Sequence, residues 1–193
     1  MNNTIVRLTV FLLLVAGLSG LAVGYTNGIT APVIAVYEAE KLMQGYADVY
    51  HGADEFAERG YDGPESIIYN VVEAKRDGEA VGLIYTLKPR GFGGEMTMLA
   101  GVDFASQKIT GIRVLSHAET PGLGDRTAQP GFAERFAGKT AARELSAVGA
   151  ATSAEDEVQG VTGATVSTEA VAAGVNAAIR DANSRSSWLG GSR

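Results

Sequence analysis

The stretch 67–87, IIYNVVEAKRDGEAVGLIYTL, contains the strongest fold signal in the sequence. Two segments rich in Ile, Val, Tyr and Leu, 67–74 and 79–87, flank the pair Asp77-Gly78. β-branched and aromatic residues favour strands, and Asp-Gly is a preferred connection between antiparallel strands. The sequence therefore predicts a β-hairpin here.

The same strand pattern recurs downstream of this hairpin. Segments 95–103 and 108–116 are predicted strands connected by 104–107, and 130–136 is predicted to form a short helix. From 167 to 183 apolar residues recur at helical spacing, which predicts an amphipathic helix. Strands followed by helices indicate an α+β domain with a mostly antiparallel sheet and flanking helices. The apolar stripe of the last helix consists of Val171, Val175, Ala178, Ile179 and Ala182.

Upstream of the hairpin, the chain lacks charged side chains from Leu8 to Tyr37. The run is long enough for one transmembrane helix, and Arg7 before it favours a cytoplasmic N-terminus. A cleaved signal peptide also fits the short basic start and the small residues that follow the apolar centre. Pro32 can begin a further helix that reaches about Tyr50. Either interpretation of the apolar run predicts an exported domain.

The composition excludes several classes of chemistry. All 22 acidic residues, but only 15 of the 16 basic ones, follow the apolar run, so the exported part has a net negative charge and no basic stripe for nucleic acid. The chain has no cysteine, and two histidines, His51 and His117, leave little for a zinc site. We expect no metal site. Chemistry must therefore come from hydroxyls, carboxylates, backbone donors or a borrowed cofactor.

A first candidate binding segment follows the last predicted strand. In 116–125 a histidine, a carboxylate and a hydroxyl precede a Pro-Gly turn and a second glycine. Glycines allow a ligand to approach the backbone, and loops on a rigid sheet commonly bind ligands. A plain turn with solvated side chains is the alternative. The candidate residues are His117, Glu119, Thr120, Gly122, Leu123 and Gly124.

A second candidate segment, QGVTGATVST at 159–168, comes directly before the last predicted helix. Helix N-terminal amides lack internal partners, so a glycine turn that leads into a helix suits a phosphate. Hydroxyl capping of an ordinary helix explains the same residues. No lysine lies in the segment, which argues against a nucleoside triphosphate loop.

These two segments resemble known motifs. Thr162-Gly163-Ala164-Thr165 resembles the [ST]-G-A-T motif of exported FMN-binding domains in the G subunit of the Rnf electron-transport complex and the C subunit of the sodium-pumping NADH:quinone reductase. The stretch 111–124 is similar to the family's H-x-E-T-P-G-L-G segment. The resemblance implies FMN bound covalently through its phosphate to Thr165. It also implies a surrounding site formed by the 117–124 loop residues and Thr162, Gly163, Ala164, Ser167 and Thr168.

The resemblance also sets expectations for the whole protein. The chain length favours the G subunit, an electron-relay subunit of an ion-translocating ferredoxin:NAD oxidoreductase in the inner membrane, with the FMN domain on the periplasmic side. Expected partners are the other complex subunits and a flavin transferase. The family's usual aspartate before the motif is Gln159 here. The reductase's C subunit and an exported non-flavin binding or scaffold subunit are alternatives, whereas a free hydrolase lacks a serine elbow or triad.

The expected organisation follows from these assignments. Residues 1–25 are a transmembrane anchor, 26–60 a connecting helix, 61–183 the exported FMN-binding domain and 184–193 a flexible tail.

Overall fold

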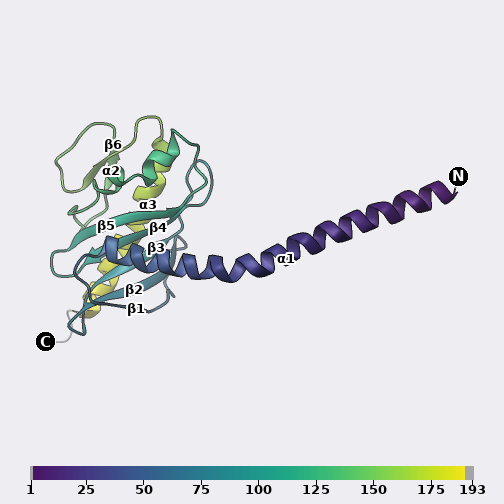
Figure 1. The fold of residues 1–193 in the computed structure, drawn as a ribbon. Helices are drawn as coiled ribbons and strands as arrows, with labels where there is room; N and C mark the ends of the chain where they lie inside the picture. Colours follow the sequence, from purple (N-terminus) through teal and green to yellow (C-terminus); the bar gives the residue numbers. More distant parts are fainter. Residues whose placement is uncertain (1, 190–193) are drawn as a thin grey trace. The chain divides into compact units, whose positions relative to one another are not determined.

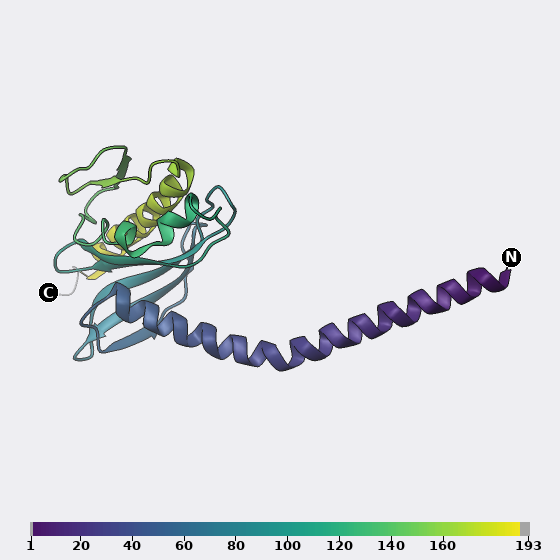
Figure 2. The same ribbon diagram turned by 45° about the horizontal axis from the view of Figure 1, so that its top comes forward.

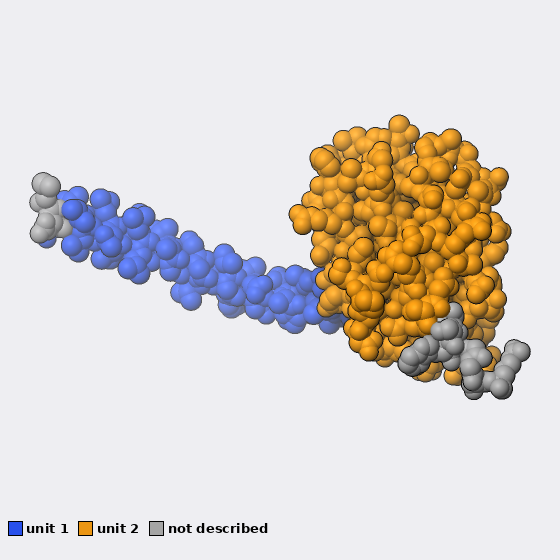
Figure 3. Space-filling model, turned by 180° about the vertical axis from the view of Figure 1, so that it is seen from behind, with its two compact units in different colours: residues 1–42 blue, residues 43–193 orange. Residues whose placement is uncertain are grey.

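The computed structural model describes residues 2–189, which divide into two units at residues 42 and 43 (Figure 3). The first unit consists of helix alone, and the second contains the sheet and the remaining helices. The division falls within one long helix.

Helix α1, Asn2–Val49, forms the whole first unit and extends into the second. Its apolar side chains up to Tyr37 are exposed, and a window of mean hydropathy 2.2 makes it long and apolar enough to cross a membrane. Pro32 lies inside this helix, so the expected separate helix from Pro32 is a continuation of α1. The helix ends at Val49, close to the expected Tyr50, so the segment 26–60 assigned to a connecting helix is helical only as far as Val49. The proposed division at residues 25 and 26 stays a prediction.

The second unit is built on a five-stranded antiparallel sheet of order β1-β2-β3-β4-β5 (Figure 1). Both predicted hairpins are confirmed, with Asp77 and Gly78 in the first turn at positive φ. β1 was not predicted, because it is short and has glutamates at both ends, and it lies in the segment assigned to the connecting helix. The strands are β1 Glu55–Glu58, β2 Ile68–Arg76, β3 Glu79–Leu87, β4 Thr97–Asp103 and β5 Lys108–Ser116.

Helix α3, Thr165–Leu189, covers one face of this sheet (Figure 2). Its predicted apolar stripe is buried against strand residues such as Tyr85, Leu87 and Met98, all of them 0% exposed. The predicted helix 167–183 is thus confirmed but extends further at both ends. Residues 184–189, expected in a flexible tail, continue α3, and residues 190–193 lie outside the described part.

The end of α1, from Met43 on, covers the opposite face of the sheet (Figure 2). A Cβ at Gly82 or Gly101 would collide with Tyr50, Val49 or atoms of the sheet, and one at Gly111 would lie 3.2 Å from the Val49 carbonyl oxygen. The Tyr50 hydroxyl donates to Asp103 Oδ2 at 2.6 Å. Close approach of helix to sheet therefore depends on glycines, and the last turns of α1 belong to the folded domain.

Between β5 and α3 the chain forms short elements that connect the two candidate segments. A 3₁₀ helix, η1 Gly124–Ala128, precedes α2, Pro130–Ala133, which is shorter than the predicted helix 130–136. Two strands that were not predicted, β6 Ser146–Val148 and β7 Glu157–Gln159, pair in parallel. They are too short to give a periodic pattern, and β7 leads directly to the turn before α3.

Candidate functional site

The two candidate segments, about forty residues apart, line one cavity of about 380 Å³. The loop after β5 forms one part of the wall, and the turn before α3 with the first turn of α3 forms another. Cavities of this size are typical of small-molecule and cofactor sites. The cavity is lined by Phe92, Glu119, Thr120, Leu123, Gly124, Gly163, Ala164, Thr165, Val166 and Ser167.

Glu119 joins the segments that form this cavity. Its side chain is almost fully buried, and its Oε2 accepts a hydrogen bond of 2.8 Å from the hydroxyl of Ser167 in α3. Its Oε1 accepts a bond of 3.2 Å from the amide of Gly93 in the β3–β4 connection. Buried carboxylates are stable only when hydrogen-bonded or paired. Glu119 therefore holds three separate segments together beneath the cavity.

Glycines are required around this carboxylate. A Cβ at Gly91 would overlap Glu119 Oε1, and one at Gly124 would overlap Oε2 and approach Ser167 Oγ to 2.9 Å. A Cβ at Gly93 would collide with the backbone of Ala118 and Glu119. Gly124, the second glycine of the predicted loop, thus leaves space for the Glu119 side chain and does not serve only to admit a ligand.

The four hydroxyl residues of the second segment differ sharply in accessibility. Ser167 is 1% exposed and donates to Glu119, while Thr168 is 2% exposed and its Oγ1 accepts from the amide of Val161. Thr162 and Thr165 are exposed. Only these last two hydroxyls are accessible to a modifying enzyme in the folded domain.

Thr165 is distinguished from Thr162 by its position. It is the first residue of α3, where backbone amides without helical partners favour a negative charge. Thr165 also lines a second cavity of about 340 Å³, formed with Thr162, Thr168 and the end of β6. Thr165 therefore lines both cavities, at a helix N-terminus that suits a phosphate.

The turn before Thr165 is fixed by its neighbours. Gly163 has φ +84°, a conformation that favours glycine, and the amide of Ala164 donates to the carbonyl of Val161 at 3.0 Å. Arg135 Nη1 donates to the carbonyl oxygens of Gln159 and Gly160 at 2.7 and 3.1 Å. Gln159 thus contributes its backbone carbonyl to this contact. No motif in the sequence indicates the contact with Arg135.

The remaining predicted residues lie at the edge of the site. His117 is exposed, and its Nδ1 accepts a weak bond of 3.3 Å from the amide of Glu119. Gly122, with φ +79°, makes the turn between Thr120 and Leu123. Neither residue lines the two cavities beside Thr165. Phe92 lines the first cavity but was not predicted, although its setting in Gly91-Phe92-Gly93-Gly94 could have indicated an exposed aromatic loop.

A larger cavity, of about 590 Å³, lies at the other end of α3. Its buried carboxylate, Asp181, accepts bonds from the Tyr85 hydroxyl at 3.0 Å and from Arg185 Nε at 2.6 Å. Glu73 pairs with Arg59 at 2.7 Å. Asp181 and Arg185, and Glu73 and Arg59, are therefore already paired with each other. None of these four groups is an unpaired charge that could bind a ligand.

Comparison with known proteins identifies the family. Residues 91–180 match the FMN-binding domain family, which covers both candidate segments and Phe92. The chain is 31% identical over 92% of its length, and 91% of the relative's, to the G subunit of the Na⁺-translocating ferredoxin:NAD⁺ oxidoreductase complex of Acetobacterium woodii. The chain belongs to the G-subunit family of ion-translocating oxidoreductase complexes. The resemblance found in the sequence is confirmed.

Another G subunit agrees with this assignment, and a solved structure has a similar fold. The G subunit of the proton-translocating ferredoxin:NAD⁺ oxidoreductase complex of Clostridium ljungdahlii is 26% identical, with 92% of this chain and 91% of the relative covered. The fold is similar to the C subunit of a Na⁺-translocating NADH-quinone reductase from Parabacteroides distasonis, with a TM-score of 0.50, 23% identity and coverage of 71% and 76% of the two chains. The expected α+β fold is confirmed.

Proposed function

We propose that this protein relays electrons within an ion-translocating ferredoxin:NAD oxidoreductase complex through an FMN bound in the cavity between the 117–124 loop and the start of α3. The observation that carries the proposal is the convergence of two distant motif segments on this cavity, beside an exposed Thr165. Bound FMN supplies the electron chemistry, and the protein sets its position and environment. The relatives that are G subunits of such complexes support this role.

The FMN is covalently attached to Thr165 in this proposal. Its hydroxyl is accessible, whereas Ser167 and Thr168 are buried and hydrogen-bonded. Attachment joins Thr165 Oγ to the FMN phosphorus with loss of one water overall, and the first amides of α3 stabilise the remaining phosphate charge. A flavin transferase is the expected catalyst. A permanent ester keeps the cofactor bound where free flavin is dilute.

The cavity residues position the rest of the cofactor. The Thr120 hydroxyl and the backbone near Gly124 offer hydrogen-bonding groups on one side, and Leu123 offers an apolar surface. Glu119 acts as a positioning residue, because its bonds to Ser167 and Gly93 hold the cavity walls together. Non-flavin binding or scaffolding receives no support from the FMN-binding family match.

The apolar part of α1 anchors the protein in the cell membrane. Arg7 precedes the uncharged run and no other basic residue occurs before Lys41, which favours a cytoplasmic N-terminus and an extracytoplasmic FMN domain. The other subunits of the complex are the expected partners. In this arrangement the flavin exchanges electrons with neighbouring centres, and the protein has no turnover of its own.

In-gel fluorescence tests the covalent attachment. The full chain is produced together with a flavin transferase, denatured and separated, and flavin emission is recorded from the protein band. We expect emission from the wild type and from Thr162→Ala, and none from Thr165→Ala. A dark wild-type band, when the transferase modifies a known acceptor, contradicts covalent attachment. Emission from Thr165→Ala with a dark Thr162→Ala moves the attachment to Thr162.

A further inference from the structure

Exposed large apolar side chains are concentrated at the candidate FMN cavity. Between residues 43 and 185, where the side chains of the folded unit are described, five such residues are exposed, and three of them line this one cavity. Single exposed apolar residues are common on protein surfaces, but a cluster around a cavity indicates contact with something apolar. The three are Phe92, Leu123 and Val166, and the other two are Met43 and Tyr69.

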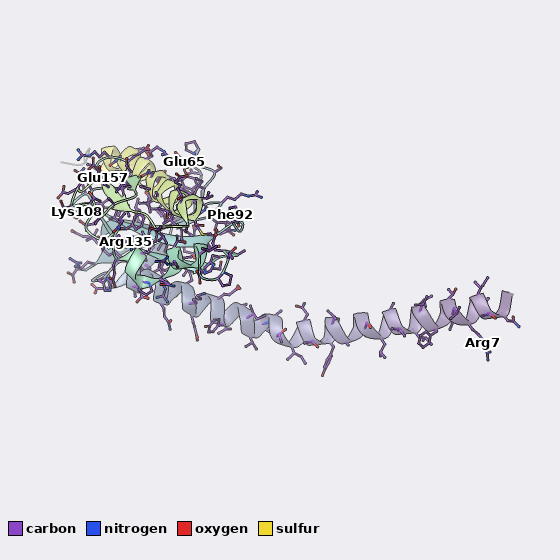
Figure 4. All side chains as sticks on the ribbon, turned by 90° about the horizontal axis from the view of Figure 1, so that it is seen from above. Arg7, Glu65, Phe92, Lys108, Arg135 and Glu157 are labelled. Carbon is purple, nitrogen blue, oxygen red and sulfur yellow. The ribbon has the colours of Figure 1, made fainter. Side chains whose placement is uncertain are left out.

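Phe92 is the most exposed of these side chains, at 77%. It lies in the β3–β4 connection and stands at the edge of the domain (Figure 4). A phenylalanine normally buries most of its large apolar surface, which favours stability. This ring has no such cover from the described residues, although it borders a cavity.

The backbone that carries Phe92 is tightly held. The amide of Gly91 donates to the carbonyl of Gly94 at 2.8 Å, and Arg90 and Glu95 form a bridge at the base of the loop. The Gly93 amide donates to the buried Glu119. Neither Gly91 nor Gly93 has space for a side chain. The loop is therefore anchored to the cavity floor while its single large side chain is presented at the rim.

The cavity has the amphipathic character of a flavin. Its exposed hydroxyl residues are Thr120, in the loop after β5, and Thr165, at the start of α3, and Phe92, Leu123 and Val166 supply its exposed apolar surface. A flavin combines a planar ring, apolar at its dimethylbenzene end, with a polar chain that ends in phosphate. Attachment at Thr165 would place the polar chain at the helix N-terminus and leave the ring to cover apolar wall residues.

We propose that Phe92, on its anchored glycine loop, packs against the isoalloxazine ring and shields it from solvent. This inference rests on the proposed FMN function and adds a ring-contacting residue outside both sequence motifs. Offset or edge-to-face contact between aromatic rings is favourable beyond simple burial. The aromatic side chain would also limit access of small solutes to the ring.

Replacement of Phe92 by tryptophan tests the contact. Tryptophan in contact with an excited flavin quenches its emission by electron transfer over short distances. In flavin-loaded full chain in detergent, we expect Phe92→Trp to lose most of its flavin emission and lifetime relative to wild type. The matched control is Tyr69→Trp, because Tyr69 is 65% exposed, packs against Lys88 and lines neither cavity beside Thr165. Emission from Tyr69→Trp should equal that of wild type.

Removal of the ring gives an independent readout. We expect the flavin in Phe92→Ala to be quenched by iodide more strongly than in wild type, while Tyr69→Ala leaves iodide quenching unchanged. Because Phe92 is so exposed, both Phe92 variants should keep the thermal unfolding midpoint of wild type. Preserved folding ensures that changed emission reports on the ring contact.

The outcomes separate this inference from the proposed function. A wild type that binds flavin, with Phe92→Trp emission and Phe92→Ala iodide quenching both equal to wild type, overturns the Phe92 contact alone. A wild type that carries no flavin, despite a competent transferase, overturns the proposed function and the Phe92 contact together.

Discussion

Glu119 is a buried carboxylate that links the walls of the candidate FMN cavity. It is 6% exposed and links the β3–β4 connection, the 117–124 loop and α3 through two hydrogen bonds. Loss of such a partner leaves buried polar groups unsatisfied, which costs more than the bond itself contributes. The resemblance assigned this residue to cofactor binding, but its contacts make it first a structural link between the cavity walls.

We predict that Glu119→Ala lowers the free energy of unfolding by about 1–3 kcal/mol, because the Ser167 hydroxyl and the Gly93 amide lose their acceptor. Glu119→Gln should lose less, since its amide oxygen can still accept one of these bonds. Denaturant titration of the apo chain measures the effect. Glu169→Ala is the control, because Glu169 is exposed on α3 two residues after Ser167. Its free energy of unfolding should stay within about 0.5 kcal/mol of wild type. Equal stability of Glu119→Ala and wild type would contradict the linking role.

The protonation of Asp103 makes the stability of the fold depend on pH in the acid range. Burial alone would raise its pKa, but hydrogen bonds from the Tyr50 hydroxyl and from the Ser106 hydroxyl and amide lower its pKa below the ordinary value of 3.8. A carboxylate with a lowered pKa stabilises the fold above its unfolded pKa, and that contribution is lost as pH falls through the folded pKa. We therefore expect the stabilising contribution of Asp103 to decrease as the pH falls below about 4, and to be lost below the pKa of Asp103 in the folded state.

The urea midpoint of wild type, measured from about pH 5 down to about pH 3, should decrease more than that of Asp103→Asn. Asp77→Asn is the control, because Asp77 lies in an exposed turn where asparagine is well tolerated. An Asp103→Asn variant whose midpoint falls as steeply as wild type would show that other carboxylates govern the acid response.

Among the elements of the folded unit, the sheet is sandwiched between α3 and the last turns of α1. Glycines at 82, 101 and 111 remove side chains from the face that receives Val49 and Tyr50. A methyl group at Gly82 would overlap the Val102 carbonyl oxygen and the Tyr50 ring. Backbone cannot easily move aside, so this face tolerates little added volume.

We predict that Gly82→Ala destabilises the domain by about 1–3 kcal/mol through overpacking. Gly131→Ala is the matched control, because no atom lies within 4 Å of its added Cβ, and it should be neutral or slightly stabilising. Thermal and denaturant unfolding report both variants. If the two substitutions have the same effect, α1 does not pack closely on this face.

The elements also show how far sequence reasoning extends. The long strands of both hairpins and the helix with a repeating apolar stripe were predictable, because each contains enough residues to show its periodic pattern. β1, β6 and β7 were missed because strands of three or four residues contain too little periodicity. α1 was expected to break at Pro32, but a single proline does not end this helix.

The site was partly predictable for a different reason. The motifs identified the two candidate binding segments, and both line one cavity in the structure. Their spacing did not reveal that Ser167 and Thr168 are buried, or that Arg135 and Phe92 belong to the same region. Such contacts depend on how distant segments meet, and one sequence contains no direct signal for them.

In the molecule as a whole, the folded unit begins at Met43, within α1. Tyr46 and Val49 are buried in this unit, and Tyr46 contacts the ring of Phe56 in β1. The expected start of the domain at residue 61 would omit these core residues and β1. The helix end is therefore part of the domain core, whereas the residues before it are exposed along an apolar surface.

Two truncations test this boundary. A chain that starts at Met43 should be soluble without detergent and unfold cooperatively, because it lacks the apolar run but retains Tyr46, Val49 and Tyr50. A chain that starts at Glu55 should fail to fold, since those buried side chains are gone. Circular dichroism and thermal unfolding distinguish the two. Cooperative folding of both would place the domain boundary after α1.

The central claim is that Thr165 carries FMN through a phosphoester, and peptide mass spectrometry tests it most directly. The full chain, produced with a competent flavin transferase, is digested and the peptide that contains residues 162–168 is fragmented. We predict a mass increment of FMN less one water, located on Thr165 by the fragment ions. An increment located on another residue, or a fully unmodified peptide, would contradict the claim.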